Sequence, residues 1–200
     1  MYEELRGHGF TVITVGLDRS DDDARPWIEA AKPTHPSLID PWHVVADLYN
    51  AVNVPTDIWI DERGRIVRPN DAVFGTDTFK ELSGIASGPH LDALRAWVTT
   101  GALPFGSDDD VRARQVLPTA DEQRARAEFT LAWWLHRAGR TDSAERLFVR
   151  AGELAPHDWT IRRGSMPIRG LDPMGEPLLP LWNEWVAAGP PYYPPMKPVG

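Results

Sequence analysis

The sequence predicts a mixed α/β fold for the first half of the chain and a helical second half. Three observations lead to this prediction: an eight-residue apolar segment at 10–17, a β-hairpin pattern around residue 60, and helical spacing of apolar residues between and after them. The chain has 200 residues, enough for one large domain or two small ones. Its 42% hydrophobic and 25% charged residues are ordinary for a globular protein.

The first three elements are predicted between residues 10 and 40. Residues 10–17, FTVITVGL, are so apolar that they predict a strand covered on both faces, as in a parallel sheet. Ser20 and the acids at 21–23 predict a helix start, because acids are favourable at the positive end of the helix dipole. This helix is expected to bury Trp27, Ile28 and Ala31 before Pro33 ends it. Residues 37–40 predict an edge strand or an extended loop.

The next elements are a helix, a hairpin and a second helix. Residues 42–52 have helical spacing of apolar side chains, and a proline-marked loop at 53–56 then leads into a strand at 57–61. Gly64 suits a turn, so residues 65–67 are expected to return as the second arm of a hairpin. Pro89 opens a helix that carries Leu91, Leu94, Trp97 and Val98, and Gly101 lies where a helix C-cap belongs. Residues 1–101 therefore read as β-α-(β)-α-β-β-α.

The second half of the chain divides into three parts. Residues 102–117 are expected to form a linker. Residues 118–157 predict a helical hairpin, because Thr119 and Glu122 form a capping-box pattern and a short turn at 138–141 separates two helical patterns. Residues 158–200 are rich in proline and are expected to be an irregular tail with one short helix at 178–187.

The segment from Phe10 to about Trp97 resembles part of a thioredoxin-like redoxin. The matching features, in the order of that superfamily, are the strand ending Val15-Gly16-Leu17-Asp18, the loop Asn53-Val54-Pro55-Thr56, the hairpin 59–67 and a closing amphipathic helix. The superfamily includes the thiol-specific antioxidant and alkyl hydroperoxide reductase group and the disulfide reductases of cytochrome maturation. The resemblance implies a cis-proline loop at Val54, Pro55 and Thr56 that lies against the active-site sulfur and pairs with the backbone of a substrate.

The chain departs from this superfamily in its sulfur chemistry. In the superfamily a central strand and a Cys-x-x-Cys helix start precede the segment that begins here at Phe10, but this sequence has only residues 1–9 there and contains no cysteine. We therefore expect a thioredoxin-like sheet that lacks its central strand and no catalytic residues for thiol exchange. The two inner strands would then present unpaired backbone groups, each costing roughly 1–3 kcal/mol when buried.

Two functional interpretations follow from this departure. In the first, the chain is the C-terminal part of a thiol–disulfide or peroxide oxidoreductase, either shortened at its N-terminus or completed by another chain, and it is inactive in redox chemistry as written. In the second, it is a redox-inactive module for protein binding or assembly. A third interpretation, an unrelated α/β protein that shares only the hairpin pattern, would be supported by a trans Val54–Pro55 bond outside any sheet.

Residues 124–159 resemble a single tetratricopeptide-like repeat. The positions that carry the resemblance run from Leu135 through Gly139-Arg140 and Phe148 to Pro156. One repeat does not bury its own apolar face, and about three are usual in a free-standing array. An ordinary helical hairpin packed on the first domain and a peptide-binding groove both remain open, so a protein or peptide is the partner class that we expect.

Composition and spacing argue against several other functions. The net charge of −8 provides no basic field that would attract nucleic acid. No apolar run is long enough to cross a bilayer, and residues 1–10 are too polar for a signal peptide. A cytoplasmic address is therefore expected. The six histidines and the acidic runs at 21–23 and 108–110 lack the spacing of a metal site, and no phosphate-binding loop is present; neither a metal nor a cofactor is therefore predicted. His43 is expected to cap a helix or lie on the surface.

Several aromatic residues are expected to be buried. Trp27, Trp59, Trp97 and Trp134 lie on the apolar faces of predicted elements and are therefore candidate core residues. Trp182 and Trp185, with Tyr192 and Tyr193, form an aromatic group that is expected to dock the tail back onto the body of the protein rather than to face a partner.

Overall fold

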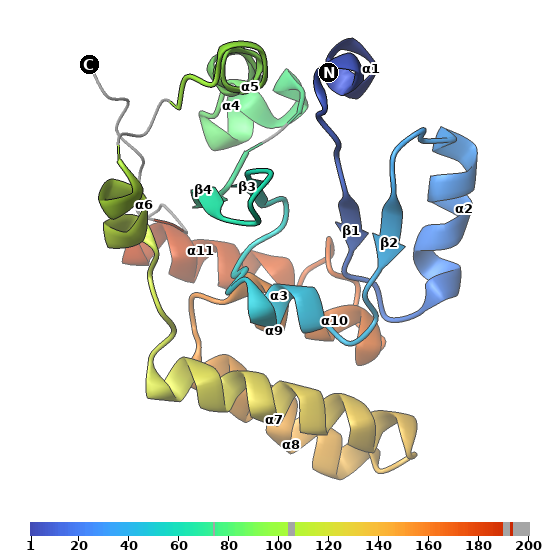
Figure 1. The fold of residues 1–200 in the computed structure, drawn as a ribbon. Coiled ribbons are helices and arrows are strands. Elements are labelled where there is room, and N and C mark those ends of the chain that lie inside the picture. Colours follow the sequence, from blue (N-terminus) through green and yellow to red (C-terminus); the bar gives the residue numbers. More distant parts are fainter. Residues whose placement is uncertain (74, 104–106, 190–192, 194–200) are drawn as a thin grey trace.

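The computed structural model describes residues 1–73, 75–103, 107–189 and 193. The chain is mixed α/β, with small sheets in its first half and helices elsewhere (Figure 1). The first half contains, in order, α1 (Tyr2–Leu5), a 3₁₀ turn (Arg6–His8), β1 (Thr14–Gly16), α2 (Asp21–Ala31), β2 (Ser37–Ile39), α3 (Val44–Leu48), β3 (Asp57–Ile60), β4 (Ile66–Asp71), a second 3₁₀ turn (Asp77–Phe79), α4 (Lys80–Ser83) and α5 (Ser87–Thr100).

The strands form two separate two-stranded sheets. β1 pairs in parallel with β2, with Val15 opposite Leu38, and β3 pairs antiparallel with β4, with Trp59 opposite Arg68. The predicted edge strand at 37–40 and the predicted hairpin are both present, and Gly64 has the positive φ of +76° that the turn requires. Among the described residues no ladder joins β1 to β3.

The strand predicted over 10–17 is correct only for three residues in its C-terminal half, Thr14–Gly16. Residues 10–13 make no backbone–backbone hydrogen bond in the described part of the chain, whereas Thr14 donates to Pro36 O at 3.1 Å and Gly16 accepts from Asp40 N at 2.8 Å. The physical reason is that a strand is defined by its ladder bonds, and β2 is only long enough to pair with Thr14–Gly16.

Helix α2 begins after Ser20 as predicted, but its expected buried face is wrong. Trp27 is 79% exposed and Ala31 is exposed as well, so that Ala24 is the buried residue of this helix. α2 packs along β2, with Ala24 beside Gly16 of β1, and its exposed residues lie on the side that no other element covers in Figure 1. The apolar pattern alone could not reveal this.

Helix α3 is shorter than the predicted helix at 42–52. It covers Val44–Leu48 and buries Ala46, while Val44 and Leu48, which were expected on the inner face, are 53% and 77% exposed. The residues that follow it, 49–56, instead form the loop that carries the candidate site.

The N-terminal core lies between the β3–β4 pair and the helices α1 and α5. Leu5, Trp59, Val67 and Leu94 are buried together, and Phe10 packs against them. Trp97 stacks on Trp59 with ring centroids 5.2 Å apart. α5 ends as predicted at Gly101, which has a left-handed φ of +74°. The predicted core positions Trp59 and Leu94 are therefore correct, and Trp97 is partly buried.

The second half contains α6 (Asp108–Arg114), α7 (Ala120–Arg137), α8 (Thr141–Leu154), α9 (Trp159–Arg162), α10 (Ser165–Ile168) and α11 (Leu178–Ala188). The capping box of Thr119 and Glu122 is present, and α7 and α8 pack as the predicted hairpin (Figure 1). Their core includes Phe129, Trp133 and Phe148. The expected core residue Trp134 is 56% exposed, because the neighbouring Trp133 occupies the inner face.

Two segments that were predicted to be irregular contain helices. The expected linker at 102–117 includes α6, which is capped by Ser107 and Asp110 and buries Val111. The expected irregular tail includes α9 and α10 in addition to the predicted short helix, which is α11. α9 and α10 pack against α7 and α8, so the hairpin core extends to Ile161 and Ile168.

Candidate functional site

The loop between α3 and β3 contains a cis peptide bond. Val54–Pro55 is cis, and both residues are exposed, whereas Asn53 is buried. Thr56 Oγ1 donates to Asn53 O at 2.8 Å across the turn. The trans bond that would support the third interpretation is therefore not present at this position. The loop therefore presents Val54 and Pro55 to solvent and holds Asn53 and Thr56 against the body of the protein.

The tail of the chain supports this loop from one side. The hydroxyl oxygen of Tyr193 accepts from Val52 N at 2.9 Å and from Asn53 N at 3.3 Å, and it hydrogen-bonds Thr56 Oγ1 at 2.9 Å. Burial raises the pKa of Tyr193 above its usual value. The sequence-based expectation that the tail aromatics dock on the body is met at Tyr193, while Tyr192 lies outside the described residues.

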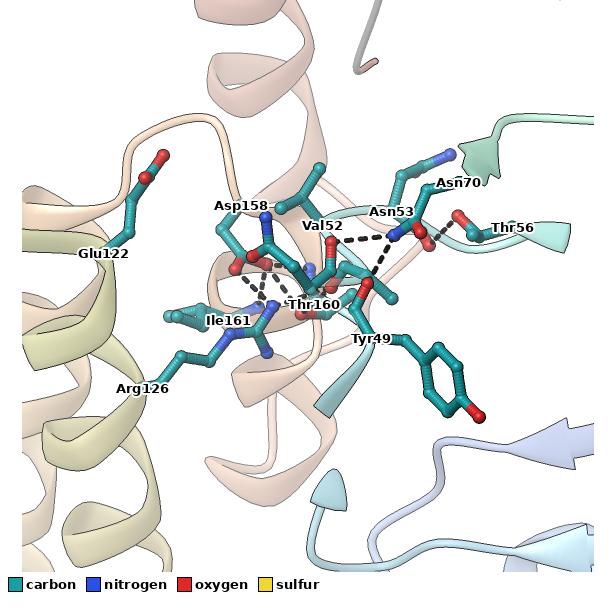
Figure 2. Close-up of polar contacts among 12 residues, drawn as sticks. Tyr49, Val52, Asn53, Thr56, Asn70, Glu122, Arg126, Asp158, Thr160 and Ile161 are labelled. Carbon is teal, nitrogen blue, oxygen red and sulfur yellow. Dashed lines mark hydrogen bonds and ion pairs between the residues drawn. The ribbon is translucent and has the colours of Figure 1, made fainter. Parts of the chain in front are cut away.

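The helical second half supports the same loop from another side (Figure 2). Trp159 N donates to Val52 O at 2.8 Å, and the carbonyl oxygen of Ala51 accepts from Arg126 Nη2 at 2.6 Å and from Thr160 Oγ1 at 3.2 Å. The loop is thus fixed to α7 and α9, which are more than 70 residues away in sequence.

A buried ion pair holds those two helices in place. Arg126 Nη2 lies 2.5 Å from Asp158 Oδ2, and both residues are more than nine-tenths buried. Asp158 also caps α9 by accepting from Thr160 N at 2.9 Å and from Ile161 N at 3.1 Å. Because a buried charge is costly unless it is paired, this contact makes the position of the loop depend on the hairpin.

A third support comes from β4. The side-chain amide of Asn70 donates to Tyr49 O at 2.7 Å and to Asn50 O at 2.9 Å, and Figure 2 shows Asn70 pointing toward the loop while the ring of Tyr49 points away. Asn50 has a φ of +48°, in the left-handed region, which asparagine tolerates better than most residues. The backbone from 49 to 56 is therefore held on three sides.

A cluster of ionisable side chains lies directly behind the loop. Asp57 Oδ2 accepts from Trp59 Nε1 at 3.0 Å and lies 3.0 Å from His90 Nε2. The guanidinium of Arg68 contacts His90 Nδ1 and Asp71 Oδ2. Since Arg68 has only N–H donors, His90 Nδ1 must accept and Nε2 must carry the proton that faces Asp57.

This cluster joins β3, β4 and α5 in one chain of polar contacts. Arg68 is 5% exposed, and its guanidinium carbon lies 4.9 Å from the ring of Trp59. Burial, together with the nearby Asp57 carboxylate, raises the pKa of Asp71 even though Arg68 opposes the shift. Because these contacts tie Asp57 to His90 on α5 and to Arg68 on β4, the cluster fixes the start of β3 beside the cis bond. Sequence reasoning missed this cluster, since none of its spacings forms a motif.

His43 is the other histidine that the sequence singled out. It occupies the N-cap position of α3 with a left-handed φ of +56° but makes no capping hydrogen bond with its side chain. Contrary to the expected capping or surface role, it is 4% exposed and packs on Phe129 with ring centroids 5.2 Å apart. Burial, with the nearby Arg126, lowers the pKa of His43 to about 4. The side chain is therefore neutral and structural at physiological pH.

In the part of the chain that the structure describes, no side-chain cluster suited to metal binding is seen. Within residues 1–73, 75–103, 107–189 and 193, no group of three or more histidines and acids lies close enough to hold a metal ion. The chain has no cysteine. In the same residues no helix combines the length and the apolar character needed to span a bilayer.

No protein-family model, curated protein or solved structure matches this chain.

Proposed function

We propose that the chain is a thioredoxin-like protein of the redoxin type, that it forms the C-terminal part of a thiol–disulfide or peroxide oxidoreductase, and that it carries no redox activity as these 200 residues stand. The observation that carries the proposal is the cis Val54–Pro55 bond directly before β3, with both residues exposed. Thiolate chemistry needs sulfur, and the sequence contains no cysteine. A cytoplasmic address is part of the proposal.

The order of elements also supports the proposal. A parallel pair (β1 and β2), a helix, the cis-proline loop, an antiparallel hairpin (β3 and β4) and a closing helix α5 follow one another as the resemblance implies. In this proposal Val54, Pro55 and Thr56 form the loop that meets a polypeptide substrate. The contacts of Tyr193, Arg126 and Asn70 with residues 49–56 would keep this loop in one conformation without touching its exposed side.

A second candidate is a redox-inactive module for protein binding, and the surface of the helical hairpin favours it. Leu131 and Trp134 on α7 are 48% and 56% exposed, and Val149 on α8 is 46% exposed. Large apolar side chains that face solvent on neighbouring helices are a common feature of binding surfaces. A protein or peptide would be the partner in this case.

Two measurements test the proposal and separate the candidates. The purified 200-residue chain should reduce neither insulin disulfides nor a hydroperoxide in the presence of a thiol reductant, and turnover above the rate of the reductant alone would overturn the proposal. Both candidates predict this inactivity, so the mass of the protein purified from its natural source decides between them. A mass well above 22.4 kDa supports the oxidoreductase part, whereas a mass of 22.4 kDa supports the binding module.

A further inference from the structure

A cavity of about 290 Å³ lies between α3 and α7, where the N-terminal half of the chain meets the helical hairpin. Its apolar wall is formed by residues of both helices and of the turn before α3: Trp42, Val44, Leu48 and Phe129. A cavity of roughly 150 Å³ already holds a benzene molecule, so this one has room for a single ring with a polar substituent. Pockets for small molecules commonly combine such an apolar wall with a few polar groups that fix the ligand.

Two buried residues of this cavity carry a nitrogen atom without a hydrogen-bond partner. Arg126 is 7% exposed and His43 is 4% exposed, and both line the cavity. Nη2 of Arg126 contacts Asp158 (Figure 2), whereas its Nη1 has no partner among the described residues. In the same residues Nδ1 of His43 has no partner either. Because buried polar groups are nearly always hydrogen-bonded, these two nitrogens are the positions at which a ligand would gain bonds.

The entrance of the cavity consists of side chains that packing does not hold. Val44 and Leu48 are the most exposed apolar residues of the lining, at 53% and 77%. The two unpartnered nitrogens are themselves closed off from solvent. A ligand therefore reaches them by turning the side chains at the entrance aside, and rotamer changes of this kind are common on binding.

The charges around the cavity favour an uncharged ligand. The charged residues of the lining, Arg126 and Asp47, have opposite signs. The charge of Arg126 is already compensated by Asp158 at 2.5 Å, so an anion would gain little from Arg126 and would be repelled by Asp47. A cation would meet the opposite conflict. The imidazole of His43, whose pKa burial lowers to about 4, adds no charge near neutral pH.

From these observations we propose that the cavity between α3 and α7 binds a small uncharged ligand in which one apolar ring carries a primary carboxamide. The carbonyl oxygen accepts from Arg126 Nη1, the amide N–H group donates to the carboxylate of Asp47, and the ring packs on the apolar wall. Since a carboxamide is both donor and acceptor, it can bond His43 Nδ1 in either tautomer of the neutral imidazole. This inference goes beyond the proposed function and does not depend on it.

The first test compares three molecules of nearly the same shape. Benzamide is uncharged, benzoate is an anion and benzamidine is a cation, and each is titrated into the full chain while the backbone amides of α3 and α7 are followed by NMR. We expect benzamide to bind with a Kd of about 1 mM, in the range of so small a ligand. The two ions should bind at least about tenfold more weakly. Equal or tighter binding of either ion would overturn the proposal, as would the absence of shifts with about 10 mM benzamide.

The second test fills the cavity. Thr130 lines it and is exposed on α7, so Thr130→Trp should occupy the space of the ligand without disturbing the core. The matched control is Glu153→Trp, which adds the same side chain on the exposed side of α8. Benzamide should bind Thr130→Trp at least about tenfold more weakly than the wild type and bind the control equally well. Equal affinity of the two variants would show that benzamide does not occupy this cavity.

The third test changes the charge of the cavity and serves equally if Thr130→Trp does not fold. Asp47→Asn keeps the shape of an exposed side chain and removes its charge. Benzamide should bind about threefold more weakly, because a hydrogen bond to a carboxylate is stronger than one to an amide. Benzoate should bind about threefold more tightly, because the repulsion is gone. Unchanged affinity for both molecules would overturn the proposal.

Discussion

Substitution of Tyr193 by phenylalanine tests whether the tail holds the cis-proline loop. Tyr193→Phe keeps the ring and removes the oxygen that accepts from Val52 N and Asn53 N and bonds Thr56. Each lost hydrogen bond costs about 0.5–1.5 kcal/mol net. Two backbone donors, one on the partly buried Val52 and one on the buried Asn53, lose their partner. The expected loss in the free energy of unfolding is about 2 kcal/mol, or a Tm lower by roughly 4–8 °C.

The measurement is urea and thermal denaturation followed by far-UV circular dichroism, with Tyr49→Phe as the matched control. The hydroxyl of Tyr49 makes no hydrogen bond among the described residues, and its ring points away from the loop in Figure 2. The control should stay within about 0.5 kcal/mol of the wild type. If Tyr193→Phe is as stable as Tyr49→Phe, the tail does not support the loop and the reasoning is refuted.

The raised pKa of Tyr193 adds a test by pH. Because the native state keeps this proton more tightly than the unfolded state does, the stabilisation is complete below the ordinary tyrosine pKa of 10.0 and is lost as pH rises through the higher native value. Wild-type stability should therefore fall above about pH 10 more steeply than the stability of Tyr193→Phe. Parallel pH profiles would contradict the assignment.

Two other substitutions test the buried groups that position the loop. His43 has a pKa of about 4 in the native state, so the free energy of unfolding should fall by on the order of 3 kcal/mol as pH falls from 6.5 toward 4. His43→Asn should remove this dependence in urea denaturation across that range, since asparagine tolerates the left-handed backbone of this position. A variant with the same pH profile as the wild type would contradict the burial argument. Asp158→Ala should lower the free energy of unfolding by about 3–5 kcal/mol, because Arg126 keeps an uncompensated buried charge. The control is Glu153→Ala on the exposed side of α8, which should change the free energy of unfolding by less than about 0.5 kcal/mol. Equal values for the two alanine variants would show that the ion pair does not anchor α9.

Local signals in the sequence predicted much of the secondary structure. The proline-marked loop at 53–56, the turn at Gly64 and the capping box of Thr119 were all predicted correctly from the residues, and the cis Val54–Pro55 bond is the one that the resemblance implied. Each of these features depends on a proline, a glycine or a side chain that acts on its own backbone within a few residues. Such signals do not need the rest of the fold to be known.

Burial was predicted less well than helix and strand formation. Trp27 and Trp134 lie on apolar faces of correctly predicted helices, yet both are mostly exposed. Residues 10–13 have strand composition but no strand partner. An apolar pattern shows which face of an element is able to pack, and the packing itself depends on whether another element covers that face.

The supports of the candidate loop could not be predicted from the sequence. Arg126 and Tyr193 contact the backbone of residues 51–53 across 75 and 140 or more positions of the chain. The cluster of Asp57, Arg68 and His90 likewise combines two strands and a helix. No motif spacing marks these residues, because their proximity results from how the elements pack.

By itself the sequence determined that these 200 residues contain no cysteine, that a proline-marked loop enters a β-hairpin, and that a helical hairpin follows, since composition and short-range backbone preferences do not depend on distant residues. The tertiary structure decided that the helical hairpin and the tail hold the loop in place, and that among the described residues the strands form two separate pairs. Those features arise from contacts between residues far apart in the chain, and only the folded arrangement fixes which backbone groups find a partner and which do not.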